Sequence, residues 1–248
     1  MATNSLRILG VIPARYASSR FPGKPLIDLK GKTMIQRVYE GVKKSTKLTE
    51  VIVATDDARI EEEVLRFGGK VMMTSSAHTS GTDRCGEAAR MYADYDVVIN
   101  IQGDEPLVDY RQIDQLAASF DNPTTNIATL GIKEVSMEDI QNSNRIKIVV
   151  DHAQNALYFS RSPIPNFANF KEDPLGFYPF YRHIGLYAFR SSTLQELVTL
   201  IPTLLEQIES LEQLRWLYYG YKIQVVETDI ETPNIDVPED LEKVLTFI

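Results

Sequence analysis

The feature that most constrains this chain is a regular alternation, over its first hundred residues, of short apolar runs with longer amphipathic stretches. Apolar runs typical of buried strands occupy residues 6–13, 50–54, 71–74 and 96–101, and stretches with helical spacing of apolar residues occupy 33–45, 58–67 and 84–92. Strands that alternate with helices usually pair in parallel and are covered by helices on both faces. We therefore expect an α/β fold with a mostly parallel, Rossmann-like sheet in three layers (α/β/α).

Beyond residue 123 the alternation becomes irregular. Strands are predicted at 126–132, 145–151, 156–159, 185–190 and 222–227, helices at 192–200, 204–217 and 238–247, and a proline-rich ordered loop at 163–179. We expect one domain over residues 1–248 that contains an inserted mixed α+β subdomain at 124–215. The chain then returns to the first layers through its last strand and helix.

Composition excludes several classes of protein. The chain has 248 residues, 44% of them hydrophobic, which suits a packed core, and its formal net charge of -8 argues against a nucleic-acid binder. Cys85 is the only cysteine, so an intramolecular disulfide and a cysteine-rich zinc site are excluded. The start of the chain lacks the apolar run of a signal peptide, and no run reaches the ~18 apolar residues of a membrane span. We expect a cytoplasmic protein with no membrane or nucleic-acid partner.

The loop at residues 13–25 follows the first apolar run and carries Arg15, Arg20 and Lys24, with two serines and a glycine between them. Open α/β sheets bind ligands at the carboxyl ends of their strands. Cations, hydroxyls and backbone N–H groups together suit a polyphosphate. The spacing matches neither a P-loop nor a dinucleotide-binding glycine turn. We interpret the loop as a phosphate site, although the same residues would also suit a solvated loop.

Two further segments carry candidate ligands. Asp104 follows the strand at 96–101, where a carboxylate can bind Mg²⁺ that is itself bound to nucleotide phosphates, and Asp236 is a second candidate. Spacing alone does not pair the two, and Asp104 as a turn residue and Asp236 as a helix cap stay open. The segment 78–84 offers donors for a base, but it also suits a helix start capped by Thr82 or Asp83.

The loop sequence IPARYASSRFPGKPL resembles the signature loop of the 3-deoxy-manno-octulosonate (KDO) cytidylyltransferases. Further matching segments follow in order along nearly the whole chain: VATDD, MTSSAHTSGTDR, NIQGDEPL, ALYFSRSPIP, RHIGLYAFR, LEQLR and IDVPEDL. The resemblance implies a nucleotide-diphospho-sugar transferase fold with an inserted dimerisation region. It also implies transfer of CMP from CTP to KDO with release of pyrophosphate, Mg²⁺ as the cofactor, a homodimer, and a product that feeds lipopolysaccharide synthesis.

The resemblance also implies roles for individual residues. Catalysis is assigned to Arg15, Lys24, Asp104 and Asp236, the last two also as Mg²⁺ ligands. Nucleotide binding is assigned to Ala14, Arg15, Ser19, Arg20, Lys24, Ser80, Gly81, Thr82 and Arg84, and sugar binding to Gln102, Arg161, His183, Tyr187, Glu212 and Gln213. Taken one at a time, the sugar-binding candidates would equally suit ion pairs, core positions or a solvated helix face.

Competing functions remain at this point. The sugar acceptor could be an 8-amino form of KDO or a sialic acid, although the loop at 15–24 and the segment RHIGLYAFR resemble the KDO enzymes more closely. A glycosyltransferase would need an Asp-x-Asp metal motif, whereas the sequence after the central strand is QGDEP. A nucleotide sensor without turnover would bind CTP and release no pyrophosphate.

Overall fold

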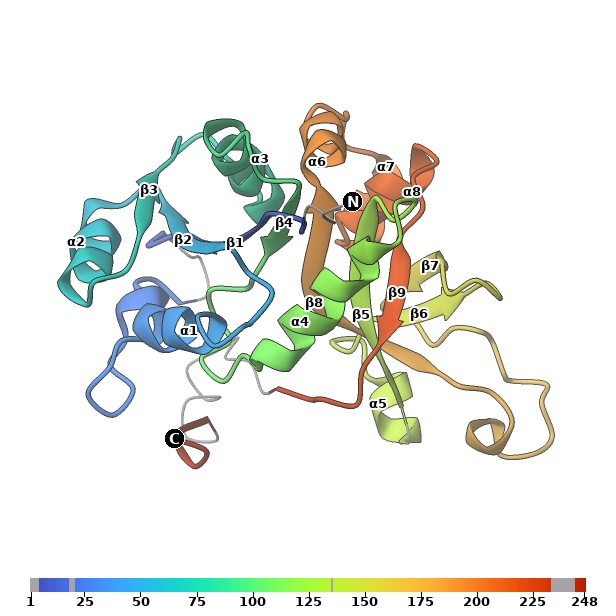
Figure 1. Ribbon diagram of the computed structural model, residues 1–248. Coiled ribbons are helices and arrows are strands. Elements are labelled where there is room, and N and C mark those ends of the chain that lie inside the picture. Colours follow the sequence, from blue (N-terminus) through green and yellow to red (C-terminus); the bar gives the residue numbers. More distant parts are fainter. Residues whose placement is uncertain (1–4, 18–20, 135, 233–243) are drawn as a thin grey trace.

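The computed structural model describes residues 5–17, 21–134, 136–232 and 244–248 (Figure 1). The strands are β1 (Ile8–Ala14), β2 (Glu50–Thr55), β3 (Val71–Met73), β4 (Val97–Asn100), β5 (Ile127–Lys133), β6 (Lys147–Val150), β7 (Ala156–Ser160), β8 (Tyr181–Arg190) and β9 (Gln224–Glu227). The helices are α1 (Met34–Val42), α2 (Ala58–Arg66), α3 (Gly81–Met91), α4 (Tyr110–Ala118), α5 (Met137–Gln141), α6 (Ser191–Leu197), α7 (Leu204–Glu209) and α8 (Gln213–Tyr218), with 3-10 turns η1 (Lys24–Leu26), η2 (Ser119–Asp121) and η3 (Pro174–Gly176).

The strands form one mixed sheet whose main path runs β3-β2-β1-β4-β8-β5-β9. The strands β3, β2, β1 and β4 are parallel to one another, and β9 is parallel to β5. The long strand β8 is antiparallel to both β4 and β5, between which it lies. The segment 124–215 therefore contributes strands to the central sheet, and the role in dimerisation assigned to it stays a prediction.

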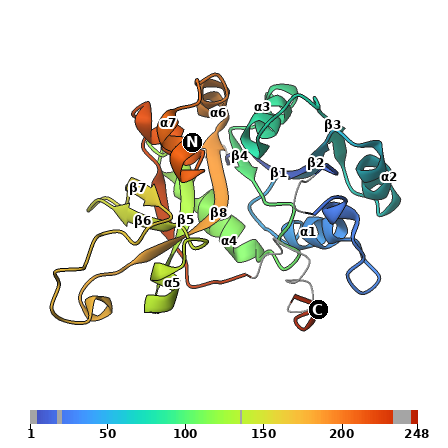
Figure 2. The ribbon, with the colours of Figure 1, turned by 180° about the vertical axis from the view of Figure 1, so that it is seen from behind.

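Helices cover both faces of this sheet, which confirms the three-layer α/β/α prediction. Side chains of β1 alternate between the two faces, with Ile12 in one hydrophobic cluster and Val11 in the other. The first cluster includes residues of α1, α2 and α4, such as Ile113, and the second includes residues of α3, α6 and α8, such as Leu194. Figures 1 and 2 show α1 and α4 on one side of the sheet and α3 and α6 on the other.

Two helix predictions are wrong in their bounds. The single helix expected at 204–217 is two helices, because Ser210 takes a left-handed conformation (φ 54°) that ends α7, after which the chain buries Leu211. Helix α3 begins at Gly81 rather than Arg84. Its cap is Ser80, whose hydroxyl accepts a hydrogen bond from the Asp83 N–H while the Asp83 carboxylate accepts one from the Ser80 N–H.

Other segments extend the predicted pattern. Helix α4, which the sequence reading did not predict, starts at the cap Asp109 and buries Ile113 and Leu116. Strand β8 begins four residues before the predicted start at Gly185. The helix predicted at 238–247 lies mostly outside the described residues. Within the described part of the chain, no helix combines the length and apolar character needed to cross a membrane.

Candidate active site

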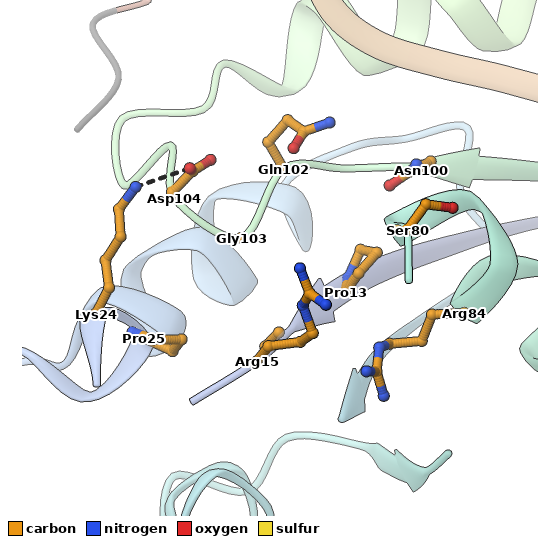
Figure 3. A pocket seen from close by; sticks show the side chains of 12 residues that line it. Pro13, Arg15, Lys24, Pro25, Ser80, Arg84, Asn100, Gln102, Gly103 and Asp104 are labelled. Atoms are coloured by element: carbon orange, nitrogen blue, oxygen red, sulfur yellow. Dashed lines mark hydrogen bonds and ion pairs between the residues drawn. The ribbon is translucent and has the colours of Figure 1, made fainter. Parts of the chain in front are cut away.

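A pocket of about 220 Å³ opens at the carboxyl ends of β1 and β4. Strand β1 pairs with β2 on one side and with β4 on the other, so the chain reverses its direction of winding at this point of the sheet. Open α/β sheets bind ligands at such reversals. The pocket is lined by Pro13, Ala14, Arg15, Lys24, Pro25, Ser80, Gly81, Arg84, Asn100, Gln102, Gly103 and Asp104. Figure 3 shows Lys24 and Asp104 at one end of the pocket and Arg84, Ser80 and Asn100 at the other.

Lys24 and Asp104 form an ion pair across one end of the pocket. Lys24 Nζ lies 2.8 Å from Asp104 Oδ2, and the two side chains are 11% and 34% exposed. Lys24 is the first residue of η1. The preceding residue, Gly23, has a left-handed backbone conformation. The structure thus brings together the lysine that we predict to be catalytic and the predicted metal ligand, which lie 80 residues apart in the sequence.

The backbone at this end of the pocket is tightly packed. A Cβ atom on Gly103 would lie 2.7 Å from the carbonyl oxygen of Pro13, so a larger residue here would push the ends of β1 and β4 apart. Gly103 therefore allows the loop that carries Asp104 to approach the loop that carries Arg15. The Arg15 side chain is exposed and lines the pocket between these two segments.

Arg84 lies at the opposite end of the pocket and is held by one ion pair and one hydrogen bond. Its side chain is 1% exposed, Nη2 lies 3.4 Å from Asp56 Oδ1, and Nη1 donates to the Thr74 hydroxyl. Ser80 and Gly81, at the start of α3, line the same end. The sequence prediction that these residues share one site is consistent with this arrangement, and the ion pair with Asp56 is an additional feature that holds Arg84 in place.

Among the sugar-binding candidates, Gln102 lines the pocket and connects it to β8. Its Nε2 donates to the Gly185 carbonyl oxygen at 2.8 Å. His183 and Tyr187 lie on either side of Gly185, with ring centroids 5.2 Å apart. Burial lowers the pKa of His183 to about 3 and raises that of Tyr187 well above its ordinary value. Both rings are therefore neutral at physiological pH, so His183 supplies no positive charge to an acidic ligand.

Glu212 connects the sugar-binding candidates to the nucleotide-binding ones. The Thr82 hydroxyl donates to Glu212 Oε2 at 2.7 Å, a contact between residues 130 positions apart. Burial raises the pKa of Glu212, and hydrogen bonds from Thr82 and Ser80 only partly oppose this effect. The carboxylate is therefore held at a cost in free energy, which is typical of functional groups more than of structural ones.

Arg161 and Gln213 do not line the pocket. The Arg161 guanidinium donates to backbone oxygens, with Nε 2.9 Å from Glu209 O and Nη1 3.2 Å from Ser143 O. Its own carbonyl oxygen accepts a hydrogen bond from the buried Lys147 Nζ at 2.5 Å. Gln213 is buried at the start of α8. Three further candidates, Ser19, Arg20 and Asp236, lie outside the described residues.

The sequence reading missed some residues that line the pocket. Asn100 is 5% exposed at the end of β4. A polar residue that ends a buried apolar strand is a signal that could have identified it. Pro13 and Gly103 also line the pocket, and the close approach of their backbones is not revealed by composition or spacing.

Comparisons with known proteins agree with this geometry. A family model described as cytidylyltransferase matches residues 9–223. Proteins named 3-deoxy-manno-octulosonate cytidylyltransferase from Bacteroides thetaiotaomicron and Porphyromonas gingivalis are 52% and 48% identical to this chain. The matches cover 98% and 97% of this chain, and 98% and 96% of the relatives. This chain belongs to the 3-deoxy-manno-octulosonate cytidylyltransferase family.

Solved structures place the fold in the same family. The structure of a CMP:2-keto-3-deoxy-manno-octonic acid synthetase complexed with CTP superposes with a TM-score of 0.90 at 43% identity, over 97% of this chain and 98% of that one. A 4-diphosphocytidyl-2C-methyl-D-erythritol synthase from Anaerococcus prevotii gives a TM-score of 0.64 at 12% identity, over 98% and 96% of the two chains, which supports the fold alone. The nucleotidyltransferase fold inferred from the sequence is therefore confirmed.

Proposed function

We propose that this cytidylyltransferase transfers CMP from CTP to the anomeric hydroxyl of KDO and releases pyrophosphate. The observation that carries the proposal is the pocket at the carboxyl ends of β1 and β4, which places Arg15 and the Lys24–Asp104 pair opposite the start of α3. A triphosphate needs cations, and a base needs fixed polar groups. The relatives named for this activity, nearly full-length matches to the chain, support the same assignment.

In the proposed reaction the anomeric oxygen of the sugar forms a bond to the α-phosphorus of CTP. The bond from that phosphorus to the bridging oxygen breaks, pyrophosphate takes the electron pair, and the hydroxyl proton is released. Lys24 and Arg15 neutralise the developing charge on the phosphate oxygens, and the Ser80–Arg84 segment holds the base. Orientation of the two substrates supplies much of the rate enhancement in such reactions.

We propose Mg²⁺ as the cofactor, with Asp104 and Asp236 as its protein ligands. The residues fit this ion because Mg²⁺ favours one or two carboxylates together with phosphate oxygens and water. Asp104 is partly exposed in the wall of the pocket, where its carboxylate can reach a bound ligand. When bound, the ion would neutralise phosphate charge and lower the pKa of the attacking hydroxyl.

We place the sugar beside Gln102, toward β8 and the start of α8. Gln102 lies between the nucleotide pocket and Gly185, and Glu212 contacts Thr82 at the start of α3. His183 and Tyr187 complete this side as neutral hydrogen-bonding groups. Because both rings are neutral, the negative charge of the sugar carboxylate must be balanced by other groups, for which Arg161 is our candidate.

The test is pyrophosphate release from CTP and Mg²⁺ with KDO, 8-amino-KDO and sialic acid in parallel assays. We expect release with KDO, and loss of turnover when Mg²⁺ is chelated. Lys24→Ala and Asp104→Ala should each lose turnover, whereas Lys32→Ala should not, because Lys32 forms a surface pair with Glu40. Tight CTP binding without release for any sugar would favour a nucleotide sensor, and release with another sugar would change the assigned acceptor.

We also propose that the enzyme acts as a homodimer in the cytoplasm, and that its product feeds lipopolysaccharide synthesis. The apolar side chains Leu204 and Ile208, one turn apart on α7, are 75% and 81% exposed, which supports a protein interface there. Light scattering of the purified protein tests the assembly. A monomeric mass at micromolar concentration would reject it.

A further inference from the structure

The ring of Tyr16, in the loop after β1, is in contact with two groups from other parts of the chain. The Arg59 guanidinium carbon lies 3.3 Å from the centroid of the Tyr16 ring. A Cβ atom on Gly23 would lie 3.2 to 3.3 Å from three atoms of the Tyr16 side chain, so this glycine backbone packs closely against the tyrosine. We call Tyr16, Arg59 and Gly23 the tyrosine clamp.

The Arg59 end of the clamp is fixed in orientation. Asp57 accepts hydrogen bonds from Arg59 Nε at 2.9 Å and from Nη2 at 2.6 Å, and its Oδ1 also accepts from the Arg59 N–H at the start of α2. A bidentate pair of this kind sets the plane of the guanidinium as well as its position. The cation is therefore held over the aromatic ring by α2, a helix of the scaffold.

The Gly23 end of the clamp sets the position of Lys24. The Gly23 N–H donates to the Tyr16 carbonyl oxygen at 2.9 Å, which joins the two ends of the loop. Gly23 has a φ of +74°, a conformation that residues with a side chain rarely adopt, and η1 begins at the next residue with Lys24. Any movement of Gly23 relative to Tyr16 would therefore also displace Lys24 from Asp104. Arg15 is the residue before Tyr16 in the chain, so the position of Tyr16 also affects Arg15.

We propose that Tyr16 is a positioning residue, clamped by Arg59 and Gly23, that holds Arg15 and Lys24 in place for the triphosphate of CTP. This inference rests on the proposed function of the loop. A cation held in advance loses less entropy when the ligand binds, so the clamp should strengthen binding of the β- and γ-phosphates in particular. A role in core packing alone would not distinguish CTP from CMP.

The experiment is calorimetric titration of the full-length protein with CTP and, separately, with CMP. We expect Tyr16→Ala and Gly23→Ala to weaken CTP binding by about tenfold and to leave CMP binding within about twofold of wild type. Tyr16→Phe, which retains the ring, should bind CTP as wild type does. Arg59→Gln should weaken CTP binding by about threefold. Its matched control is Arg66→Gln on the same helix, which should have no effect because Arg66 pairs with Glu63.

The CMP titration also shows that each variant is folded. Equal losses of CTP and CMP affinity in Tyr16→Ala would overturn the proposal, because the tyrosine would then support the nucleotide half as a whole. Wild-type CTP affinity in Tyr16→Ala, alongside a loss in Lys24→Ala, would overturn the clamp and leave the proposed function intact. Unchanged CTP affinity in Lys24→Ala would instead overturn the phosphate-binding role of the loop, and the clamp with it.

Discussion

Replacing Glu212 with glutamine should make this protein more stable at neutral pH. Burial raises the pKa of the Glu212 carboxyl even though Thr82 and Ser80 donate hydrogen bonds to it. The folded state therefore binds a proton more tightly at this site than the unfolded chain does. It follows that wild-type stability falls as the pH rises above the ordinary carboxyl value of 4.5. A glutamine keeps an acceptor for Thr82 and carries no charge.

The expected gain is a difference between two opposing effects. A hydrogen bond to a charged acceptor contributes about 1.5–3 kcal/mol and one to a neutral acceptor about 1 kcal/mol, so the substitution forfeits about 1 kcal/mol at Thr82. Removing a carboxylate from a mostly buried site recovers several kcal/mol at most, and the raised pKa indicates that the recovery exceeds the loss. We expect a net gain of about 1 kcal/mol, which corresponds to a rise in Tm of about 2–4 °C.

The assay is calorimetric unfolding of wild type and Glu212→Gln from pH 4 to pH 8. The difference in Tm should be largest at pH 8 and should disappear near pH 4, where both side chains are neutral. Glu206→Gln is the matched control on the same segment. Burial alone would raise the pKa of Glu206, but hydrogen bonds from Arg215 and Thr203 and the positive charge of Arg215 together outweigh burial and lower this pKa. Breaking that pair should destabilise the protein by about 3 kcal/mol.

Two results would refute the reasoning about Glu212. One is a glutamine variant that is less stable than wild type at pH 8, since the hydrogen bonds would then outweigh the burial of charge. The other is a Tm difference that does not change with pH, since the gain would then have a cause other than ionisation. Loss of KDO turnover in the more stable variant would show that the carboxylate is retained for function at a cost in stability.

Three further substitutions give direct tests. Lys24→Met should reduce kcat/KM by at least about a hundredfold. It should change the free energy of unfolding by at most about 1 kcal/mol, because the partner carboxylate of Asp104 is a third exposed. A large loss of stability would contradict a mainly catalytic role for Lys24. In wild type, burial lowers the pKa of His183 to about 3, so the stability of the protein should fall as the pH decreases below 6.5. His183→Gln should flatten this decline in urea titrations at a series of pH values. An unchanged dependence of stability on pH would contradict the burial of a neutral His183. Lys147→Met should destabilise the protein by about 2–4 kcal/mol in urea unfolding, because three backbone oxygens lose a donor. Lys133→Met should have little effect, because the Lys133 side chain is exposed. Equal effects of the two substitutions would contradict the role given to Lys147.

Local patterns predicted the elements of the first hundred residues well because each element there is set by its own residues. Strand β1 and helix α2, for example, follow from apolar runs and helical spacing within a few positions. The break between α7 and α8 was missed because it depends on a left-handed Ser210 and on the burial of Leu211 against distant parts of the chain. Propensity alone would continue the helix through that point.

The candidate site shows the same limit. The loop at 13–25 could be interpreted from its cations, and its position after a strand predicted which edge of the sheet it occupies. The contacts of Lys24 with Asp104 and of Thr82 with Glu212 could not be predicted, because they join residues that lie 80 and 130 positions apart. Spacing in the sequence has no bearing on contacts that the sheet topology creates.

The order of strands explains how these distant contacts arise. Because β8 lies beside β4, the Gly185 carbonyl comes within 2.8 Å of Gln102, and the sugar-binding candidates on β8 are brought to the edge of the nucleotide pocket. The Thr82–Glu212 hydrogen bond then joins the start of α3 to the start of α8. A ligand that orders the start of α3 would thereby also fix the Glu212 carboxylate, which we predict to bind the sugar. On this arrangement, bound CTP should strengthen KDO binding, and Thr82→Val should weaken that coupling more than Thr82→Ser does in paired titrations.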